Sequence, residues 1–388
     1  MASIKAGVIG LGFIAPAHVE ALRRLGDVEV VAVAGARHGT AEAKAAQLGV
    51  PRAYADWRDL VADPDVQVVH NCTPNFLHYE VNMAAIEAGK AIVCEKPLAM
   101  DAQQAAELLR AVKAAGVIHA VCLNNRMYPL TQEMKARVAR GDIGEVRLVH
   151  GAYLQDWLLY ETDYNWRIDP AMGGAARTVG DIGTHWLDLA QFVTGLKIAA
   201  VYADLVTFLP RRRKPKAHVD AFAGLGLKPE EYEEVEVTTE DCGLILLRFE
   251  NGARGACVLS QMCAGRKNYL TLEVYGARGS LAWNLERPNE LWLGHRDRPN
   301  ELLPKDPVLL APAARACAHY PGYHNEGYPD TFKNLFREVY AAVREGGKMP
   351  DNPTWPTFEA GYRANLVVDA ILRSTEEQRW VAVAFDKS

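Results

Sequence analysis

The chain has 388 residues, of which 49% are hydrophobic and 23% are charged, a composition typical of a globular protein with a sizeable core. This length accommodates two domains on the usual scale of roughly 150 residues each. The formal net charge of −5 argues against a nucleic-acid or anionic membrane partner, and the seven scattered cysteines without a Cys-x-x-Cys pair argue against disulfides and structural zinc.

Targeting signals are not expected at the start of the chain, because an apolar strand and a glycine turn begin almost at once. No apolar run approaches the length of about 20 residues that spans a bilayer. We therefore expect a cytoplasmic protein with no membrane partner and no resident metal.

Short apolar runs alternate with helix-like stretches in the first third of the chain. The expected strands are 6–9, 28–34, 66–71, 91–94 and 117–122, and the helix-like stretches are 15–25, 40–48, 79–88 and 102–115. Such alternation indicates βαβ units and a parallel sheet covered on both faces. We predict an α/β domain of the Rossmann type over residues 1–128.

A glycine turn follows the first predicted strand directly. Gly10-Leu11-Gly12-Phe13-Ile14-Ala15 matches G-x-G-x-x-G/A between a strand and a helix. Gly10 makes the tight turn, Gly12 lets a pyrophosphate approach the backbone, and the helix N-terminus offers donors to it. A glycine turn can also serve geometry alone, but its place at the head of a βαβ series favours dinucleotide binding by the segment that contains Phe13 and Ile14.

The end of the second predicted strand lacks the acidic residue that usually binds the adenosine ribose. Gly35 stands there, followed by Arg37 and His38. A glycine removes the repulsion that an acid would exert on a 2′-phosphate, and Arg37 and His38 could pair with that phosphate. The segment therefore favours NADP over NAD, with a simply exposed Arg37 as the alternative.

Two polar tripeptides follow the third and fourth long strands. Thr73-Pro74-Asn75 precedes a helix that begins near His78, and Glu95-Lys96-Pro97 follows the strand that ends at Cys94. Open α/β sheets bind ligands at the carboxyl ends of their strands, so Lys96 is well placed for chemistry. Alone, the second tripeptide would more often be a surface turn.

The pattern changes after about residue 129. A helix at 130–140 is followed by apolar or alternating runs at 146–153, 199–208, 242–249, 254–260 and 270–275, with further helices at 330–343 and 358–374. Asn251-Gly252 and Gly276 to Gly279 are expected to form hairpin turns. We predict a second, α+β domain over 129–388 with a large, mostly antiparallel open sheet, whose last helices could pack on the first domain.

The basic cluster 211–216 interrupts this domain beside the acidic stretch 230–236. A solvated loop is the expected structure, and an anion-binding lid is the alternative.

Aromatic and hydrogen-bonding side chains crowd the segment from Tyr153 to Arg167. A pocket for a sugar ring has this composition, so we expect substrate contacts from Tyr153, Gln155, Asp156 and Arg167. The tryptophans of the segment could equally be core or subunit-interface aromatics.

Asp181 and His185 lie four residues apart in Gly180-Asp181-Ile182-Gly183-Thr184-His185, so they share a face if the segment is helical. A carboxylate beside an imidazole suits acid–base chemistry near neutral pH. A metal site is the minor alternative, because no third and fourth ligand is evident nearby, and a capping or core role also remains open.

Together these segments resemble the glucose–fructose oxidoreductase and inositol dehydrogenase family (Gfo/Idh/MocA). The resemblance rests on six segments, which are 8–12, Thr73-Pro74-Asn75, Glu95-Lys96-Pro97, Asn124-Asn125-Arg126, 181–185 and 356–361. It covers nearly the whole chain and implies a Rossmann domain followed by an open antiparallel sheet. The outer face of that sheet commonly mediates oligomerisation in the family, which implies a homodimer or homotetramer.

The family's roles transfer position by position. Lys96 would be the catalytic lysine, Asp181 the substrate-binding acid and His185 the proton-transferring base. The resemblance implies cofactor contacts for Thr73, Asn75, His78, Glu95 and Asn124, and a substrate contact for Arg126. Two departures are Gly35, in place of the acid of NAD-preferring members, and Asn125, where many members have a second arginine.

The implied activity is hydride transfer between NADP or NAD and a secondary alcohol of a sugar, glycoside or cyclic polyol. His185 would accept the hydroxyl proton, Asp181 would orient the substrate and Lys96 would stabilise the developing alkoxide. One alternative is a glycosidase that uses transient oxidation by a tightly held NAD. Another is a regulator that senses dinucleotide and sugar without turnover.

Overall fold

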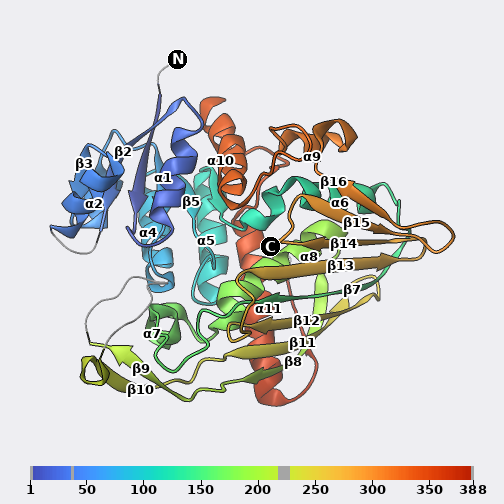
Figure 1. Cartoon of the computed structure of the whole chain (residues 1–388). Coiled ribbons are helices and arrows are strands. Elements are labelled where there is room, and N and C mark those ends of the chain that lie inside the picture. The colour runs from blue at the N-terminus through green and yellow to red at the C-terminus, as the bar shows by residue number, and fades with distance from the viewer. Residues whose placement is uncertain (1–2, 36–38, 217–227, 386–388) are drawn as a thin grey trace. The chain divides into compact units, whose positions relative to one another are not determined.

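A computed structural model describes residues 3–35, 39–216 and 228–385 of the chain (Figure 1). The chain divides into two compact units. Unit 1 consists of Met1–Asn124 and Tyr328–Asn365, and unit 2 consists of Asn125–Gly327 and Leu366–Ser388. The long helix α11 (Phe358–Glu377) contributes residues to both units.

Unit 1 contains a six-stranded parallel sheet in the order β3-β2-β1-β4-β5-β6. Its strands are β1 (Ile4–Ile9), β2 (Val28–Ala34), β3 (Arg52–Tyr54), β4 (Val68–Asn71), β5 (Ala91–Cys94) and β6 (His119–Val121). Its helices, besides the first part of α11, are α1 (Ala15–Arg23), α2 (Thr40–Leu48), α3 (Trp57–Ala62), α4 (His78–Glu87), α5 (Ala102–Ala115) and α10 (Tyr328–Arg344). The strand order reverses between β1 and β4, and such a switch point is where this fold binds dinucleotides.

Local sequence explains these elements. In β2 every residue except Glu29 is buried, as expected for a parallel strand covered on both faces. Helix α5 begins where the side chain of Asp101 accepts a hydrogen bond from the Gln104 amide, and it ends at Gly116 in the left-handed conformation. The α/β prediction is confirmed, and the strands at 28–34 and 91–94 and the helix at 102–115 match their predicted bounds.

Unit 2 contains a nine-stranded sheet in the order β16-β15-β14-β13-β7-β12-β11-β8-β17, with β7 and β12 as its parallel pair. Its strands are β7 (Val146–Leu154), β8 (Ile198–Val206), β11 (Cys242–Phe249), β12 (Arg254–Ser260), β13 (Tyr269–Gly276), β14 (Ser280–Asn284), β15 (Glu290–Gly294), β16 (Glu301–Pro304) and β17 (Val381–Ala382). The prediction of a large, mostly antiparallel sheet is confirmed, as is the turn at Asn251-Gly252, where Gly252 has a φ of 90°.

One face of this sheet packs on helices and the other is open. Helices α6 (Pro129–Ala139) and α8 (Thr184–Thr194) and the second part of α11 supply residues to the buried core, in which Trp186 and Trp283 are almost fully buried. Shorter helices are α7 (Pro170–Gly173) and α9 (Pro312–Ala316). Strand β11 alternates buried and exposed residues, and Leu244 and Leu246 are each 49% exposed on the open face.

The expectation of a solvated loop at 211–216 is wrong. Arg211–Pro215 forms β9, which pairs antiparallel with β10 (Tyr232–Glu236) (Figure 1). Basic residues of β9 lie opposite glutamates of β10, so charge pairing replaces the apolar pattern by which strands are recognised. Among the residues that the structure describes, we find no helix long and apolar enough to cross a membrane.

Candidate active site

The glycine turn of unit 1 has the geometry that its sequence predicts. Gly10 has a φ of 90°, and a Cβ there would lie 2.5 Å from the carbonyl carbon and oxygen of Cys72. Glycine is therefore required where β1 ends beside β4. A Cβ on Gly12 would meet no atom within 4 Å, so the backbone is open at the position where a pyrophosphate is expected. Ala15 is fully buried, and Phe13, near Ile14, is 64% exposed.

His78 connects the two polar loops that follow β4 and β5. Its Nδ1 lies 2.6 Å from the carbonyl oxygen of Pro97, and its Nε2 lies 2.9 Å from that of Thr73. Burial lowers the pKa of His78, although the two carbonyls oppose this shift. The ring is only 1% exposed, so it holds the two loops together; the direct cofactor contact expected of His78 remains a prediction.

The neighbouring cofactor candidates of unit 1 are also buried. Thr73 donates its hydroxyl to the side-chain oxygen of Asn71 over 2.7 Å. Asn75 is 7% exposed, and Asn124 donates to the Thr331 hydroxyl over 2.7 Å. Gly35 directly follows β2 and donates its amide to the carbonyl of Tyr54. Arg37 and His38, on which the preference for NADP depends, lie outside the described residues.

Lys96 follows Glu95 at the carboxyl end of β5, and the Lys96–Pro97 peptide bond is cis. The amide of Lys96 donates to Oε2 of Glu95 over 3.2 Å, while Oε1 of Glu95 lies 3.0 Å from Nε2 of His18. Lys96 thus follows a residue, Glu95, whose carboxylate is hydrogen-bonded to His18 of helix α1.

His18, Glu95 and Cys122 are buried and have potential metal-ligating atoms within 4.8 Å of one another. Both ring nitrogens of His18 already have hydrogen-bonding partners, Glu95 and His70. Burial raises the pKa of the Cys122 thiol well above its usual value, which disfavours the thiolate that binds metals. We therefore interpret this cluster as a hydrogen-bonded network.

Asp181 and His185 are carried by consecutive turns of unit 2. Asp181 lies in a π-helical turn (Val179–Gly183), and His185 lies in the first turn of α8. The four-residue spacing predicts a shared face on a regular α-helix, whereas here the first of the two turns is π-helical. Gly183 permits the wider turn to pack closely, because a Cβ there would lie 2.7 Å from the side chain of Leu259. Single π-helical turns of this kind are frequent at functional sites.

The carboxylate of Asp181 is held by two side chains. Arg167 donates from Nε to Oδ1 over 3.1 Å, and Gln261 donates from Nε2 to Oδ2 over 2.8 Å. The guanidinium of Arg167 also contacts Asn165 and lies over the ring of Trp166. A positive charge and an amide donor both favour the ionised form of a carboxylate, so Asp181 is suited to accept hydrogen bonds from substrate hydroxyls.

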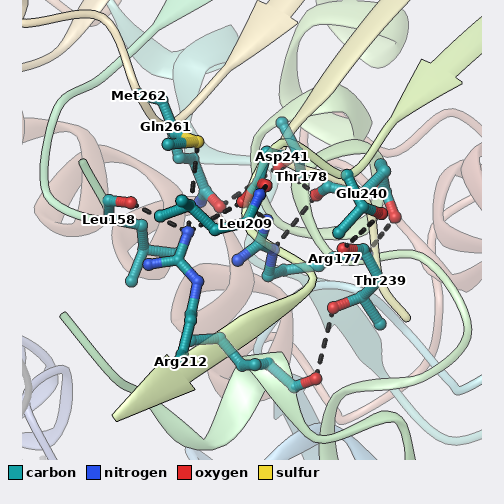
Figure 2. A network of polar contacts seen from close by, with 12 residues as sticks. Leu158, Arg177, Thr178, Leu209, Arg212, Thr239, Glu240, Asp241, Gln261 and Met262 are labelled. Atoms are coloured by element: carbon teal, nitrogen blue, oxygen red, sulfur yellow. Dashed lines mark hydrogen bonds and ion pairs between the residues drawn. The ribbon is translucent and has the colours of Figure 1, made fainter. Parts of the chain in front are cut away.

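Gln261 is itself part of a buried hydrogen-bond network (Figure 2). The hydroxyl of Thr178 lies 3.3 Å from Oε1 of Gln261, which directs the amide group of Gln261 toward Asp181. Asp241 accepts hydrogen bonds from Arg177 and Arg212, and both arginine side chains are fully buried. Burial by itself would raise the pKa of Asp241, but the two arginines lower it by more. The carboxylate therefore stays ionised and keeps its hydrogen bonds to both arginines.

Aromatic and amide groups lie near His185. The ring centroids of Tyr153 and His185 are 6.4 Å apart, and Tyr153 donates its hydroxyl to Asn268 over 2.6 Å. Gln155 donates to the same oxygen of Asn268. Burial, together with the nearby Asp181 carboxylate, raises the pKa of Tyr153, so its phenol remains a donor. Tyr153 and Gln155 are thus gathered near the Asp181 and His185 turn.

Two predicted substrate residues have other partners. Asp156 forms a 2.7 Å ion pair with Lys267 and accepts the amide of Gly265. Arg126 donates to both oxygens of Asp188, and its guanidinium lies over the ring of Phe192. Substrate contacts from Asp156 and Arg126 remain predictions.

The predicted catalytic residues are divided between the units. Lys96 belongs to unit 1, and Asp181 and His185 belong to unit 2. Sequence reasoning missed His18, Gln261 and Asn268, which support these groups. A polar residue on the buried face of the first helix was a usable signal for His18, whereas Gln261 and Asn268 lie far along the chain from the motifs that they serve.

Two family models match the chain. Residues 4–123 match the family described as "Oxidoreductase family, NAD-binding Rossmann fold", and residues 131–282 match the "GFO/IDH/MocA C-terminal domain". The chain is 32% identical over 396 residues to levoglucosan dehydrogenase of Pseudarthrobacter phenanthrenivorans, with 99% of each chain covered. It is 27% identical to myo-inositol 2-dehydrogenase of Thermotoga maritima, covering 97% of this chain and 98% of that protein.

Solved structures give the same result. A levoglucosan dehydrogenase in complex with NADH and L-sorbose has a TM-score of 0.88 at 31% identity, covering 99% of this chain and 100% of the other. An inositol dehydrogenase homologue from Azotobacter vinelandii, complexed with NAD+, has a TM-score of 0.83 at 26% identity, with 98% and 97% covered.

Proposed function

Because the chain belongs to the Gfo/Idh/MocA oxidoreductase family, we propose that it transfers a hydride between a nicotinamide dinucleotide and a secondary alcohol of a sugar, glycoside or cyclic polyol. The proposal rests chiefly on the end-to-end likeness to levoglucosan dehydrogenase, in a chain that has Lys96, Asp181 and His185. The NADH and NAD+ complexes of similar structures support the cofactor class.

The dinucleotide suits the residues of unit 1. Gly10 and Gly12 leave the backbone open after β1, and Thr73, Asn75 and Glu95 follow the neighbouring strands β4 and β5. When bound, the nicotinamide accepts or supplies the hydride.

The proton would be handled by this chain's own side chains. His185 is half-buried, and its imidazole would take the hydroxyl proton. Asp181, held by Arg167 and Gln261, would accept a hydrogen bond from a substrate hydroxyl. Lys96, as an ammonium, would stabilise the developing alkoxide.

A panel of anhydrosugars, free sugars, glycosides and cyclic polyols, each offered with NAD+ and NADP+, tests the proposal. We expect the 340 nm absorbance of the reduced nicotinamide to rise with at least one sugar or polyol. Glycoside cleavage without net reduction would instead identify the redox-assisted glycosidase, and ligand binding without turnover would identify the regulator. Turnover with NADP+ alone would support the cofactor preference predicted from Gly35 and Arg37, and turnover with NAD+ alone would contradict that preference.

The open face of the nine-stranded sheet is proposed to pair with a second copy of the chain, giving a homodimer or homotetramer. Its apolar patch consists of Leu148, Leu244, Leu246 and Val258, which are 40–49% exposed on neighbouring strands. Contiguous apolar surface of this kind is typical of interfaces between proteins.

Leu246→Glu is expected to convert the assembly to a monomer of 42.7 kDa, because a glutamate at the centre of this patch would be buried without a partner. Light scattering coupled to size exclusion measures the mass. Val308→Glu is the control, since Val308 is 79% exposed and lies outside the sheet, in Pro307–Leu309. An unchanged mass in Leu246→Glu, or a monomeric wild type, would contradict the proposed interface.

A further inference from the structure

A chain of three hydrogen bonds runs through the core of unit 1 behind the Glu95–Lys96 turn. Oε1 of Glu95 lies 3.0 Å from Nε2 of His18, and Nδ1 of His18 lies 2.9 Å from Nδ1 of His70. Nε2 of His70 lies 2.9 Å from the hydroxyl of Tyr340. The two histidines and Tyr340 have no measurable exposure, so the chain has no contact with solvent except near Glu95.

The elements around the chain leave few other charges near it. The ring centroids of Phe332 and Phe336 in α10 lie 5.0–5.2 Å from that of His18. Titratable groups near the chain, among the described residues, are Glu95 with its neighbours Lys96 and His78, the thiols of Cys72, Cys94 and Cys122, and Tyr340. Burial raises the pKa of each of these three thiols and of Tyr340, which keeps them neutral. Glu95 is therefore the ionisable partner to which the histidines respond.

Donor and acceptor chemistry permits one arrangement of protons when Glu95 is ionised and both histidines are neutral. A carboxylate only accepts, so His18 must carry its proton on Nε2, and its Nδ1 must then accept from Nδ1–H of His70. Nε2 of His70 is consequently bare and accepts the hydroxyl proton of Tyr340. Every donor in the chain points toward Glu95.

Adding one proton to Glu95 would reverse every bond in the chain, because the protonated carboxyl would donate to Nε2 of His18. His18 would donate from Nδ1, His70 would donate from Nε2, and Tyr340 would have to accept at its oxygen. The hydroxyl proton of Tyr340 would then lose the acceptor that it has in the described structure, at the cost of a buried unpaired donor. Burial and the neighbouring His18 lower the pKa of His70 well below its usual value, in agreement with the uncharged arrangement.

We propose that His18, His70 and Tyr340 form a directional hydrogen-bond relay that positions the Glu95 carboxylate and keeps it ionised beside Lys96. His18 is a positioning residue that acts through Glu95, and Tyr340 sets the direction of the relay. The effect on turnover rests on the proposed dehydrogenase function. The tautomers that the relay requires are independent of that function.

Two replacements of His18 separate hydrogen bonding from packing. The side chain of His18→Gln keeps a donor for Glu95 and an acceptor for His70, whereas His18→Leu keeps neither. We expect His18→Leu to lower kcat by about tenfold to a hundredfold, the range that a lost hydrogen bond to a charged group gives, and His18→Gln to recover most of that loss. Equal kcat values in the two variants, with both proteins folded by circular dichroism, would show a purely structural role.

Tyr340→Phe tests the direction of the relay. Without the hydroxyl, the present arrangement leaves the bare Nε2 of His70 without a donor, and the reversed arrangement leaves its Nε2–H without an acceptor. Neither direction is then fully paired, so the relay loses its preference for the present one and takes up a proton more easily. The acid limb of the kcat profile should move to higher pH by about one unit. The control is Tyr79→Phe, which removes a phenol donor to Glu107 at the surface of the same unit. An acid limb that stays in place in Tyr340→Phe, or moves equally in Tyr79→Phe, overturns the proposal.

Ring-nitrogen NMR of the ¹⁵N-labelled wild type tests the relay without substrate. We expect His18 as the Nε2–H tautomer and His70 as the less common Nδ1–H tautomer at neutral pH, assigned by the loss of their signals in His18→Gln and His70→Asn. The opposite tautomers would overturn the relay whatever the enzyme's activity. The expected tautomers without any turnover would leave the relay standing and refute the dehydrogenase.

Discussion

Lys96→Ala and His185→Ala are each expected to lower turnover by at least about two orders of magnitude while dinucleotide binding persists. A positioned general base contributes about 10²–10⁴-fold, and preorganised charge at a developing alkoxide contributes about as much. Stopped-flow measurement of the nicotinamide absorbance gives the rate, and titration of NADH fluorescence gives the affinity.

The matched controls are Lys113→Ala and His295→Ala, which remove a lysine and a histidine from the same two units outside the proposed site. Both should keep turnover close to that of the wild type. Near-normal turnover in both Lys96→Ala and His185→Ala would refute the catalytic assignment, and a joint loss of turnover and NADH binding would assign the residue to the cofactor instead.

Acidification is expected to loosen unit 1 around His119. Burial lowers the pKa of His119 to about 4, and Nδ1 accepts the amide of Phe358 over 3.1 Å, which requires that nitrogen to be bare. The unfolded chain takes up a proton below pH 6.5, but the folded chain does so only near pH 4. Stability should therefore fall as the pH drops between these values, by about 3 kcal/mol from this residue.

Hydrogen exchange of the peptide that contains the Phe358 amide, corrected for the intrinsic effect of pH, measures this loss. His119→Asn keeps an acceptor for that amide but cannot ionise, so protection in this variant should depend less on pH. His324→Asn, which changes an exposed histidine of unit 2, is the control. Identical pH dependence in wild type and His119→Asn would exclude His119 as the source.

Hydrophobic patterning predicted most of both sheets, because strands that are buried on one or both faces must be apolar at regular intervals. The runs at 28–34 and 242–249 match β2 and β11 residue for residue. Strands β9 and β10 were missed because their pairing depends on cross-strand charge, which resembles a solvated face in the sequence. Short strands such as β3 and β17 carry too few residues to show a period.

The candidate site was predictable where a motif is local. Gly10 occupies the conformation that the fingerprint requires, and Asp181 and His185 lie on successive turns, although the first turn is π-helical. The supporting groups were not predictable, since Gln261 reaches Asp181 across 80 positions of sequence. Only the folded sheet decides which distant amide meets which carboxylate.

The chain passes between the two units three times, after Asn124, Gly327 and Asn365, so neither unit is one continuous stretch of sequence. A protein engineer who transplants the dinucleotide-binding unit into a relative must carry Tyr328–Asn365 along with Met1–Asn124. A fragment that stops near residue 128 would lose α10, and with it Phe332, Phe336 and Tyr340 that enclose His18 and His70. Chimeras joined at a single boundary should therefore express as insoluble or poorly folded protein, and exchanges of both segments together should not.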